Sequence, residues 1–198
     1  MAENRTILGY NPPAGSEERT KLLRLIVIAG HNLAKKDIFG ASDPYIRIDL
    51  MTNADVVEDS VVTKTRKRTL NPVWREEMIF RVLPEKHKLI FEVFDENRLT
   101  RDDFLGMVEL PITNNIPKDV ASDTRRKEDY YTLRPRSAKS KVKGHLQLYL
   151  AYLDGQDTED EVEAGLNIGA TAQENGQRVP TRATEEDWEI VGKLNIDF

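Results

Sequence analysis

Oxygen-bearing side chains gather in two short polar segments of the chain, residues 35–45 and residues 94–106. Each segment contains a glycine and several polar residues and lies between apolar runs, which predicts a loop. If the fold brings the two loops together, four or more carboxylates converge and repel one another. A hard divalent cation relieves that repulsion, and calcium takes about six to eight oxygen ligands in proteins. The two segments therefore predict a calcium-gated site.

An EF-hand loop is the first alternative, because the run Asp95-Glu96-Asn97 begins like one. The sixth position of such a loop needs glycine for a sharp turn, and the twelfth needs a bidentate glutamate. This chain has Thr100 at the sixth position and Gly106 at the twelfth. A contiguous EF-hand is therefore excluded, and the site must be shared between the two segments.

Composition restricts the classes of protein that this chain can belong to. It has 198 residues, 39% hydrophobic and 32% charged, which predicts one soluble domain with additional segments. No apolar run approaches the roughly 18 residues of a membrane span, and the first residues lack the pattern of a secretory signal. There is no cysteine, which excludes a disulfide framework, a thiolate zinc site and a cysteine nucleophile within these residues. No arrangement of serine, histidine and aspartate suggests a hydrolase, so we expect that the chain itself is not an enzyme.

Charge is distributed unevenly along the chain. Residues 154–198 carry twelve acidic and three basic side chains, a balance of −9, whereas the whole chain has a net charge of −5. The first 153 residues therefore have a balance of +4, which suits an anionic partner. Nucleic acid is not the expected partner, because no aromatic side chains are interleaved with the basic ones.

The apolar patterning predicts an all-β chain, with eight short strands in an antiparallel β-sandwich. Residues 1–20 predict a flexible N-terminal leader, residues 21–153 the folded domain and residues 154–198 a disordered acidic linker or tail. Trp188 belongs to a small apolar island in the tail, which is a chance cluster, the edge of a following domain or a docking motif. The eight strand-like runs are 22–29, 45–50, 61–65, 77–82, 89–94, 104–110, 130–133 and 146–153.

Several landmarks, in the same order along residues 22–153, resemble the C2 domain family. They are S-D-P-Y at 42–45, N-P-x-W at 71–74, D-x-N at 95–97 and F-L-G at 104–106. The resemblance implies the C2 fold with type II strand order, in which the two loops meet at one end of the sandwich and bind Ca²⁺. The calcium ligands that it implies are Asp37, Asp43, Asp95, Asn97 and Asp103.

Asn97 is a departure from the family pattern, because many members have aspartate at that position. An amide oxygen can still coordinate calcium, but the site carries one negative charge fewer.

The sequence is more closely similar to one subgroup, the N-terminal C2 domains of the Nedd-family HECT ubiquitin ligases, in residues 33–45, 91–106 and 135–146. In that family, WW domains and a catalytic HECT domain follow the C2 domain. Trp74 and Trp188 are too far apart to belong to one WW domain, and HECT chemistry needs a cysteine. The resemblance therefore implies that this chain is the targeting and regulatory region of an E3 ubiquitin-protein ligase.

The resemblance also implies an electrostatic switch, in which calcium reverses the negative charge of the loops and permits contact with an anionic membrane. The expected lipids are phosphatidylserine and phosphoinositides. Three basic residues at alternate positions would lie on one face of a strand and bind the lipid headgroups, because alternate strand residues point to the same side. Apolar side chains at the loop tips would insert between the headgroups. The alternatives are a solvated strand face and inward packing of Phe39. The basic trio is Lys64, Arg66 and Arg68, and the apolar tip residues are Ile38, Phe39 and Leu99.

Three functional hypotheses remain open. In the first, the chain is a monomeric, cytoplasmic module that calcium recruits to the plasma membrane or to endosomes. In the second, it is a protein-interaction module that binds the HECT domain of its own parent ligase and holds it inactive. In the third, it is a fragment of an enzyme, for which the sequence offers no catalytic constellation.

Overall fold

The computed structural model describes residues 7–35, 42–97, 100–120, 127–138 and 140–153, together with the backbone of residues 178–179. In these ranges the chain forms ten strands and no helix, so the all-β prediction is confirmed. No helix in the described part has the length and hydrophobicity to cross a membrane. Two strands more than the predicted eight are present, and both are short; β1 (Ile7–Gly9) lies in the expected leader and β10 (Arg178–Val179) in the expected tail.

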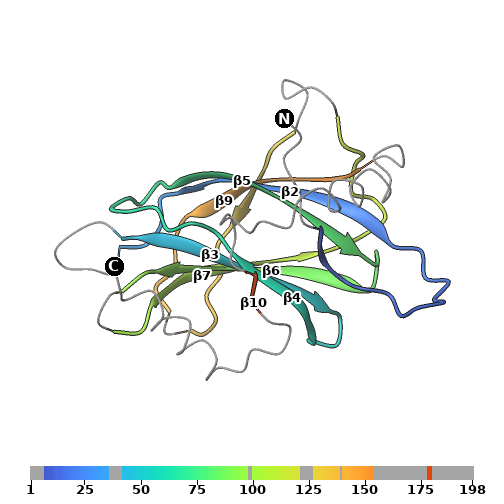
Figure 1. Ribbon diagram of the computed structural model, residues 1–198. Helices are drawn as coiled ribbons and strands as arrows, with labels where there is room; N and C mark the ends of the chain where they lie inside the picture. The colour runs from blue at the N-terminus through green and yellow to red at the C-terminus, as the bar shows by residue number, and fades with distance from the viewer. Residues whose placement is uncertain are drawn as a thin grey trace, which may run out of the picture.

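The strands form two five-stranded sheets that lie face to face (Figure 1). One sheet, called sheet A, has the order β1-β5-β2-β9-β8, and sheet B has the order β10-β4-β3-β6-β7. All pairs are antiparallel except β1 with β5. The strands are β1 (Ile7–Gly9), β2 (Lys21–His31), β3 (Pro44–Thr52), β4 (Val57–Val62), β5 (Val73–Val82), β6 (His87–Asp95), β7 (Asp103–Pro111), β8 (Asp129–Thr132), β9 (His145–Tyr152) and β10 (Arg178–Val179).

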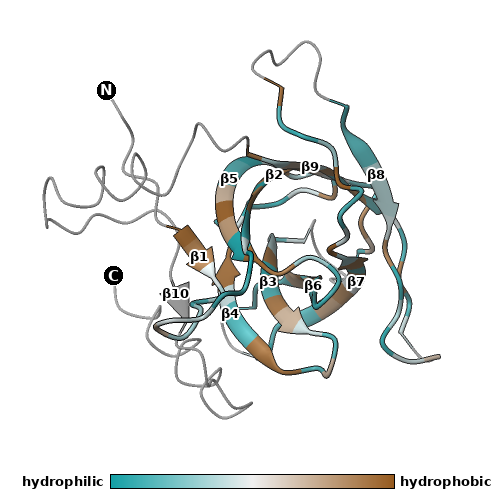
Figure 2. Cartoon of the chain, turned by 90° about the vertical axis from the view of Figure 1, so that its right-hand side faces the viewer, coloured by the Kyte–Doolittle hydropathy of each residue, from teal (hydrophilic) through white to brown (hydrophobic). Residues whose placement is uncertain are grey.

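The core lies between the two sheets, because alternate residues of each long strand point inward. Figure 2 views the molecule from one end, with β5, β2, β9 and β8 above β4, β3, β6 and β7. The largest fully buried side chains include Phe80 of β5 and Phe91 of β6. Their aliphatic neighbours from both sheets are Leu23, Leu25, Val27, Ile46, Ile48, Leu50, Leu89, Val93, Leu105, Leu146 and Leu148.

β1 shows how a segment without strand patterning can still join a sheet. Leu8 is part of the core cluster, and the backbone N–H of Gly9 donates to the buried carboxylate of Asp59, at 2.7 Å. The pairing with β5 is long-range and parallel, so the three-residue strand is stabilised by contacts that are distant in sequence. The pattern of apolar residues near β1 therefore could not have indicated this strand.

Gly144 directly precedes β9, lies against the end of β2 and cannot carry a side chain without strain. Its φ is +95°, and an added Cβ would lie 2.4 Å from the carbonyl oxygen of His31. We expect Gly144→Ala to lower the free energy of unfolding by about 2–3 kcal/mol, from the left-handed backbone and the clash together. Chemical denaturation measures this. Gly15→Ala is the matched control, because Gly15 also has positive φ (+80°) but has no atom near its Cβ position. An equal loss in both variants would contradict the close-approach explanation.

Candidate functional site

Three of the predicted calcium ligands meet at one end of sheet B. Asp43 immediately precedes β3, Asp95 ends β6 and Asp103 begins β7. The register places Pro44 opposite Asp95, and Asp95 opposite Asp103. The sheet therefore brings together residues from segments that are far apart in the sequence, as the loop hypothesis expects.

A β-bulge in β7 sets this alignment. The pairing of β6 with β7 shifts by one residue between Val93 and Phe94, which leaves Leu105 as the extra residue. Without this bulge, Asp95 would lie opposite the residue after Asp103. Because Leu105 is fully buried in the core, its packing stabilises the bulge and so holds the two aspartates in register.

The carboxylates at this end accept hydrogen bonds from nearby N–H groups. The backbone N–H of Asp43 donates to Oδ1 of Asp95 at 2.6 Å, and the backbone N–H of Arg68 donates to Oδ1 of Asp43 at 2.6 Å. Nδ2 of Asn97 donates to Oδ2 of Asp103 at 3.1 Å. Asp95 is almost fully buried, at 1% exposure, so its charge depends on such donors. These hydrogen bonds link Asp43 with Asp95, and Asn97 with Asp103, at one end of sheet B.

Tyr45 and Asp102 fix the shape of the second loop, a role that the sequence did not reveal. Oδ1 of Asp102 accepts the backbone N–H of Asn97 at 2.7 Å, and its Oδ2 accepts the hydroxyl of Tyr45 at 2.8 Å. Burial, followed by the hydrogen bond to Asp102, raises the pKa of Tyr45 far above its usual value. Tyr45 therefore remains a hydrogen-bond donor, and Asp102 has a positioning role beside its neighbour Asp103.

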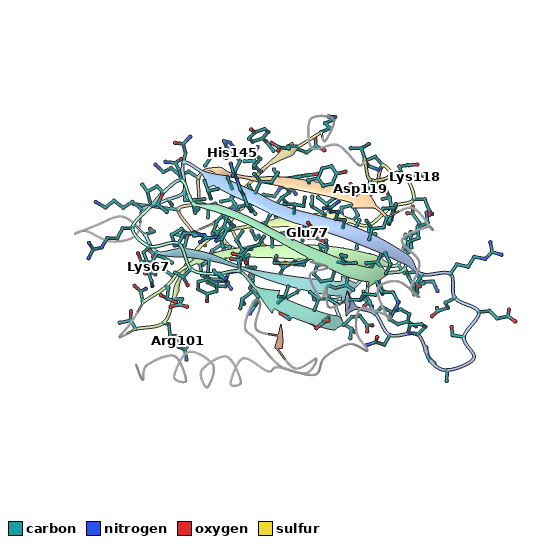
Figure 3. All side chains as sticks on the ribbon, turned by 45° about the horizontal axis from the view of Figure 1, so that its top comes forward. Lys67, Glu77, Arg101, Lys118, Asp119 and His145 are labelled. Carbon is teal, nitrogen blue, oxygen red and sulfur yellow. The ribbon has the colours of Figure 1, made fainter. Side chains whose placement is uncertain are left out.

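Lys67 and Glu96 also belong to the site, although the sequence did not single them out. The Lys67 ammonium lies 3.4 Å from Oδ2 of Asp43 and contacts Oε2 of Glu96. Glu96 is held in place by the hydroxyl of Thr65 at 2.9 Å. The signal that could have indicated this pair is the position of Glu96 directly after Asp95 and of Lys67 inside the basic run. Figure 3 shows Lys67 and Arg101 at one end of the sandwich, with Lys118 and Asp119 at the other.

The prediction that the basic trio lies on a strand is wrong. β4 ends at Val62. The backbone N–H of Ile46 donates to the hydroxyl of Thr63, the next residue, whereas in a continuing strand pair it would donate to a backbone carbonyl oxygen. The chain then turns at residues 67–68, where Arg68 has a left-handed φ of 55°. The residues of the trio therefore do not share a strand face.

The three basic side chains have different surroundings. Lys64 and Arg68 are exposed, whereas Arg66 is half-buried. The Arg66 guanidinium donates to the carbonyl oxygen of Trp74 at 2.9 Å and lies 3.6 Å from Oε1 of Glu76. Lys64 and Arg68 thus offer charge to solvent, while Arg66 also fastens this segment to β5.

Four predicted site residues lie outside the described residues, namely Asp37, Ile38, Phe39 and Leu99. Their roles as a calcium ligand and as membrane-inserting side chains stay predictions.

The donor chemistry at this end of sheet B suits calcium, because carboxylate and amide oxygens are the ligands that this ion prefers. In the described ranges, no three His, Cys, Asp or Glu side chains are grouped as a metal site requires. Asp43, Asp95 and Asp103 are engaged by N–H donors, and the Lys67 ammonium lies beside Asp43. An ion at this end would have to compete with those donors and with the ammonium.

Comparisons with known proteins agree with this architecture. The model of the C2 domain family matches residues 21–133. The E3 ubiquitin-protein ligase Nedd-4 of Drosophila melanogaster is 57% identical over 151 residues, which are 74% of this chain and 15% of that protein. The chain therefore spans only a small part of the length of this curated relative.

Two solved structures extend the comparison. The C2A domain of plant Extended Synaptotagmin 1 has a TM-score of 0.55 and 28% identity, and the match covers 67% of this chain and 94% of that one. The calcium-bound C2A and C2B domains of Extended Synaptotagmin 2 have a TM-score of 0.50 and 25% identity, with coverage of 75% and 52%.

Proposed function

Because the chain belongs to the C2 domain family, we propose that it is a module that binds anionic phospholipid when calcium is present. The observation that carries this proposal is the alignment of Asp43, Asp95 and Asp103 across three neighbouring strands. The similarity to a calcium-bound C2 structure supports the same chemistry.

The calcium ligands that we propose come from both loops. When bound, the ion supplies positive charge and coordination positions that phosphate or carboxylate oxygens of a lipid can fill. The aspartates hold the ion, and Asp102 and Tyr45 keep the second loop in position through their hydrogen bonds. The proposed ligands are Asp37, Asp43, Asp95, Asn97 and Asp103.

Charge explains why the module would need calcium. The first 153 residues have a balance of +4, yet Asp43, Asp95 and Asp103 meet at the end of sheet B that would face a membrane. Exposed Lys64 and Arg68 contribute about 1 kcal/mol each near an anionic leaflet, too little to overcome several carboxylates at the contact. Neutralising the carboxylates is therefore the step that permits binding.

The similarity to Nedd-4 suggests the context of this module. We propose that the parent protein is an E3 ubiquitin-protein ligase and that this region brings it from the cytoplasm to plasma or endosomal membranes when calcium rises. The matched part of Nedd-4 is 15% of that protein, so its ligase activity would reside in parts that this chain does not include.

Sedimentation with vesicles tests the proposal. We expect the chain to pellet with phosphatidylserine-containing vesicles in calcium and to remain in the supernatant in EGTA, because the carboxylates repel the lipid without the ion. Vesicles of phosphatidylcholine alone are the control for charge and should not retain the chain in either condition. Equal pelleting with and without calcium would contradict the proposal, as would no pelleting at all.

A further inference from the structure

Lys67 occupies an unusual place among the basic side chains of this chain. Its ammonium lies between two carboxylates, 3.4 Å from Oδ2 of Asp43 and in contact with Oε2 of Glu96. One of these carboxylates is a predicted calcium ligand, and the other directly follows Asp95 in the second loop. The ammonium thus joins the two loops at the point where calcium is proposed to join them.

The surrounding backbone holds Lys67 in this position. The N–H of Arg68 donates to Oδ1 of Asp43, and the N–H of Glu96 donates to the carbonyl oxygen of Asp43, at 3.0 Å. The hydroxyl of Thr65 fixes the other oxygen of Glu96. Both carboxylates are therefore oriented before the ammonium pairs with them, so this ion pair requires less ordering of its acidic partners than an ordinary surface ion pair does.

We propose that Lys67 is the resident counter-ion of the calcium site, and that it couples calcium binding to lipid binding. This inference rests on the proposed function. In the absence of calcium, the ammonium neutralises part of the charge of Asp43 and Glu96. With a divalent ion held at Asp43, the Lys67 ammonium would leave that carboxylate and become available to an anionic lipid headgroup.

The arrangement has two opposite consequences for affinity. Lys67 lowers the affinity for calcium in solution, because the ion must displace it from Asp43. It raises the affinity for anionic lipid once calcium is bound, because the released ammonium faces the headgroups. The side chain is half exposed, so it can move from one partner to the other without a change in the fold. Burial tends to lower the pKa of Lys67, but Glu96 and then Asp43 raise it overall, so the ammonium is charged while it pairs with them.

Lys88 provides a matched control for this interpretation. Its ammonium also lies between two carboxylates, 2.6 Å from Asp55 and 2.9 Å from Glu109. Lys88 is near the start of β6, whereas Asp95 ends that strand, a separation of about 24 Å at about 3.4 Å per residue. The two lysines therefore share a pairing with two carboxylates and differ in their position relative to the site.

The experiment compares the wild-type chain with Lys67→Met, Lys67→Arg and Lys88→Met in two assays. The first is calorimetric titration with calcium in the absence of lipid. The second is partition onto phosphatidylserine vesicles at saturating calcium. We expect Lys67→Met to bind calcium about three- to tenfold more tightly, since a neighbouring positive charge is removed. We expect it to partition onto vesicles about fivefold less, which corresponds to one basic group at an anionic surface.

Lys67→Arg keeps the charge, and Lys88→Met removes a charge from the distant pair, so both should match the wild type in both assays. Unchanged or weaker calcium binding by Lys67→Met would overturn the counter-ion role, and unchanged partition would overturn the coupling to lipid. If the wild-type chain itself shows neither calcium heat nor calcium-dependent partition, the proposed function fails together with this inference. If the wild-type chain behaves as expected and only the Lys67 variants do not, this inference fails and the proposed function stands.

Discussion

Changing Asp95 and Asp103 together to asparagine is expected to abolish calcium-dependent vesicle binding and to weaken calcium affinity by at least about 100-fold. The two carboxylates lie opposite each other in the register of β6 and β7. A carboxylate in contact with a divalent ion contributes several kcal/mol even at the dielectric constant of water, so the loss of two charges exceeds about 2.7 kcal/mol. Calorimetric titration and vesicle sedimentation measure the two effects.

The asparagine substitution is chosen because it separates charge from structure. An amide oxygen at position 95 can still accept the backbone N–H of Asp43, which Asp95 accepts at 2.6 Å. Asp55→Asn with Glu109→Gln is the control, since it removes two carboxylates beside Lys88 at the other end of sheet B. Calcium affinity that survives the change at 95 and 103, or that falls equally in the control, would show that the site lies elsewhere.

Changing Phe91 to alanine is expected to cost about 3–5 kcal/mol of unfolding free energy. Phe91 is fully buried in the middle of β6, the strand that carries Asp95, and it contributes to the core between the two sheets. The cost combines the lost transfer of the ring from water with the cavity that remains. Denaturation in urea measures it as a lower midpoint, and the fraction that remains folded should keep its calcium affinity.

Val73→Ala is the matched control for Phe91→Ala. Val73 begins β5 but is 52% exposed, so its truncation should change stability by less than about 0.5 kcal/mol. A similar loss in both variants would contradict the assignment of the core to the space between the sheets.

Period-two patterning predicted the long strands because each buries one face. The run at residues 45–50 alternates strictly in sequence, and β3 indeed turns Ile46, Ile48 and Leu50 into the core. The prediction that β4 extends to residue 65 is wrong for a local reason. The hydroxyl of Thr63, rather than a backbone carbonyl oxygen, accepts the N–H of Ile46. β1 and β10 were missed because they pair with strands distant in the sequence and have too few residues to show a pattern.

The site was predictable to the extent that it depends on strand ends. Asp43, Asp95 and Asp103 stand next to recognisable strands, so their meeting at one end of a sheet follows from the fold. The part played by Lys67 was missed, because strand alternation placed it on the face opposite the basic trio. The turn at Lys67 and Arg68 instead directs it to Asp43 and Glu96. The alternation of residues along a strand does not predict which contacts a side chain makes from a turn.

The central claim is that the calcium site and the lipid site are coupled, and one measurement tests it directly. Calcium is titrated into the wild-type chain by calorimetry, with and without phosphatidylserine vesicles. Because coupling is reciprocal, a lipid that binds better to the calcium form must also tighten calcium binding. We expect the dissociation constant for calcium to fall at least about tenfold when vesicles are present, a coupling free energy of about 1.4 kcal/mol. The same dissociation constant in both titrations, or no heat of binding in either, would contradict the claim.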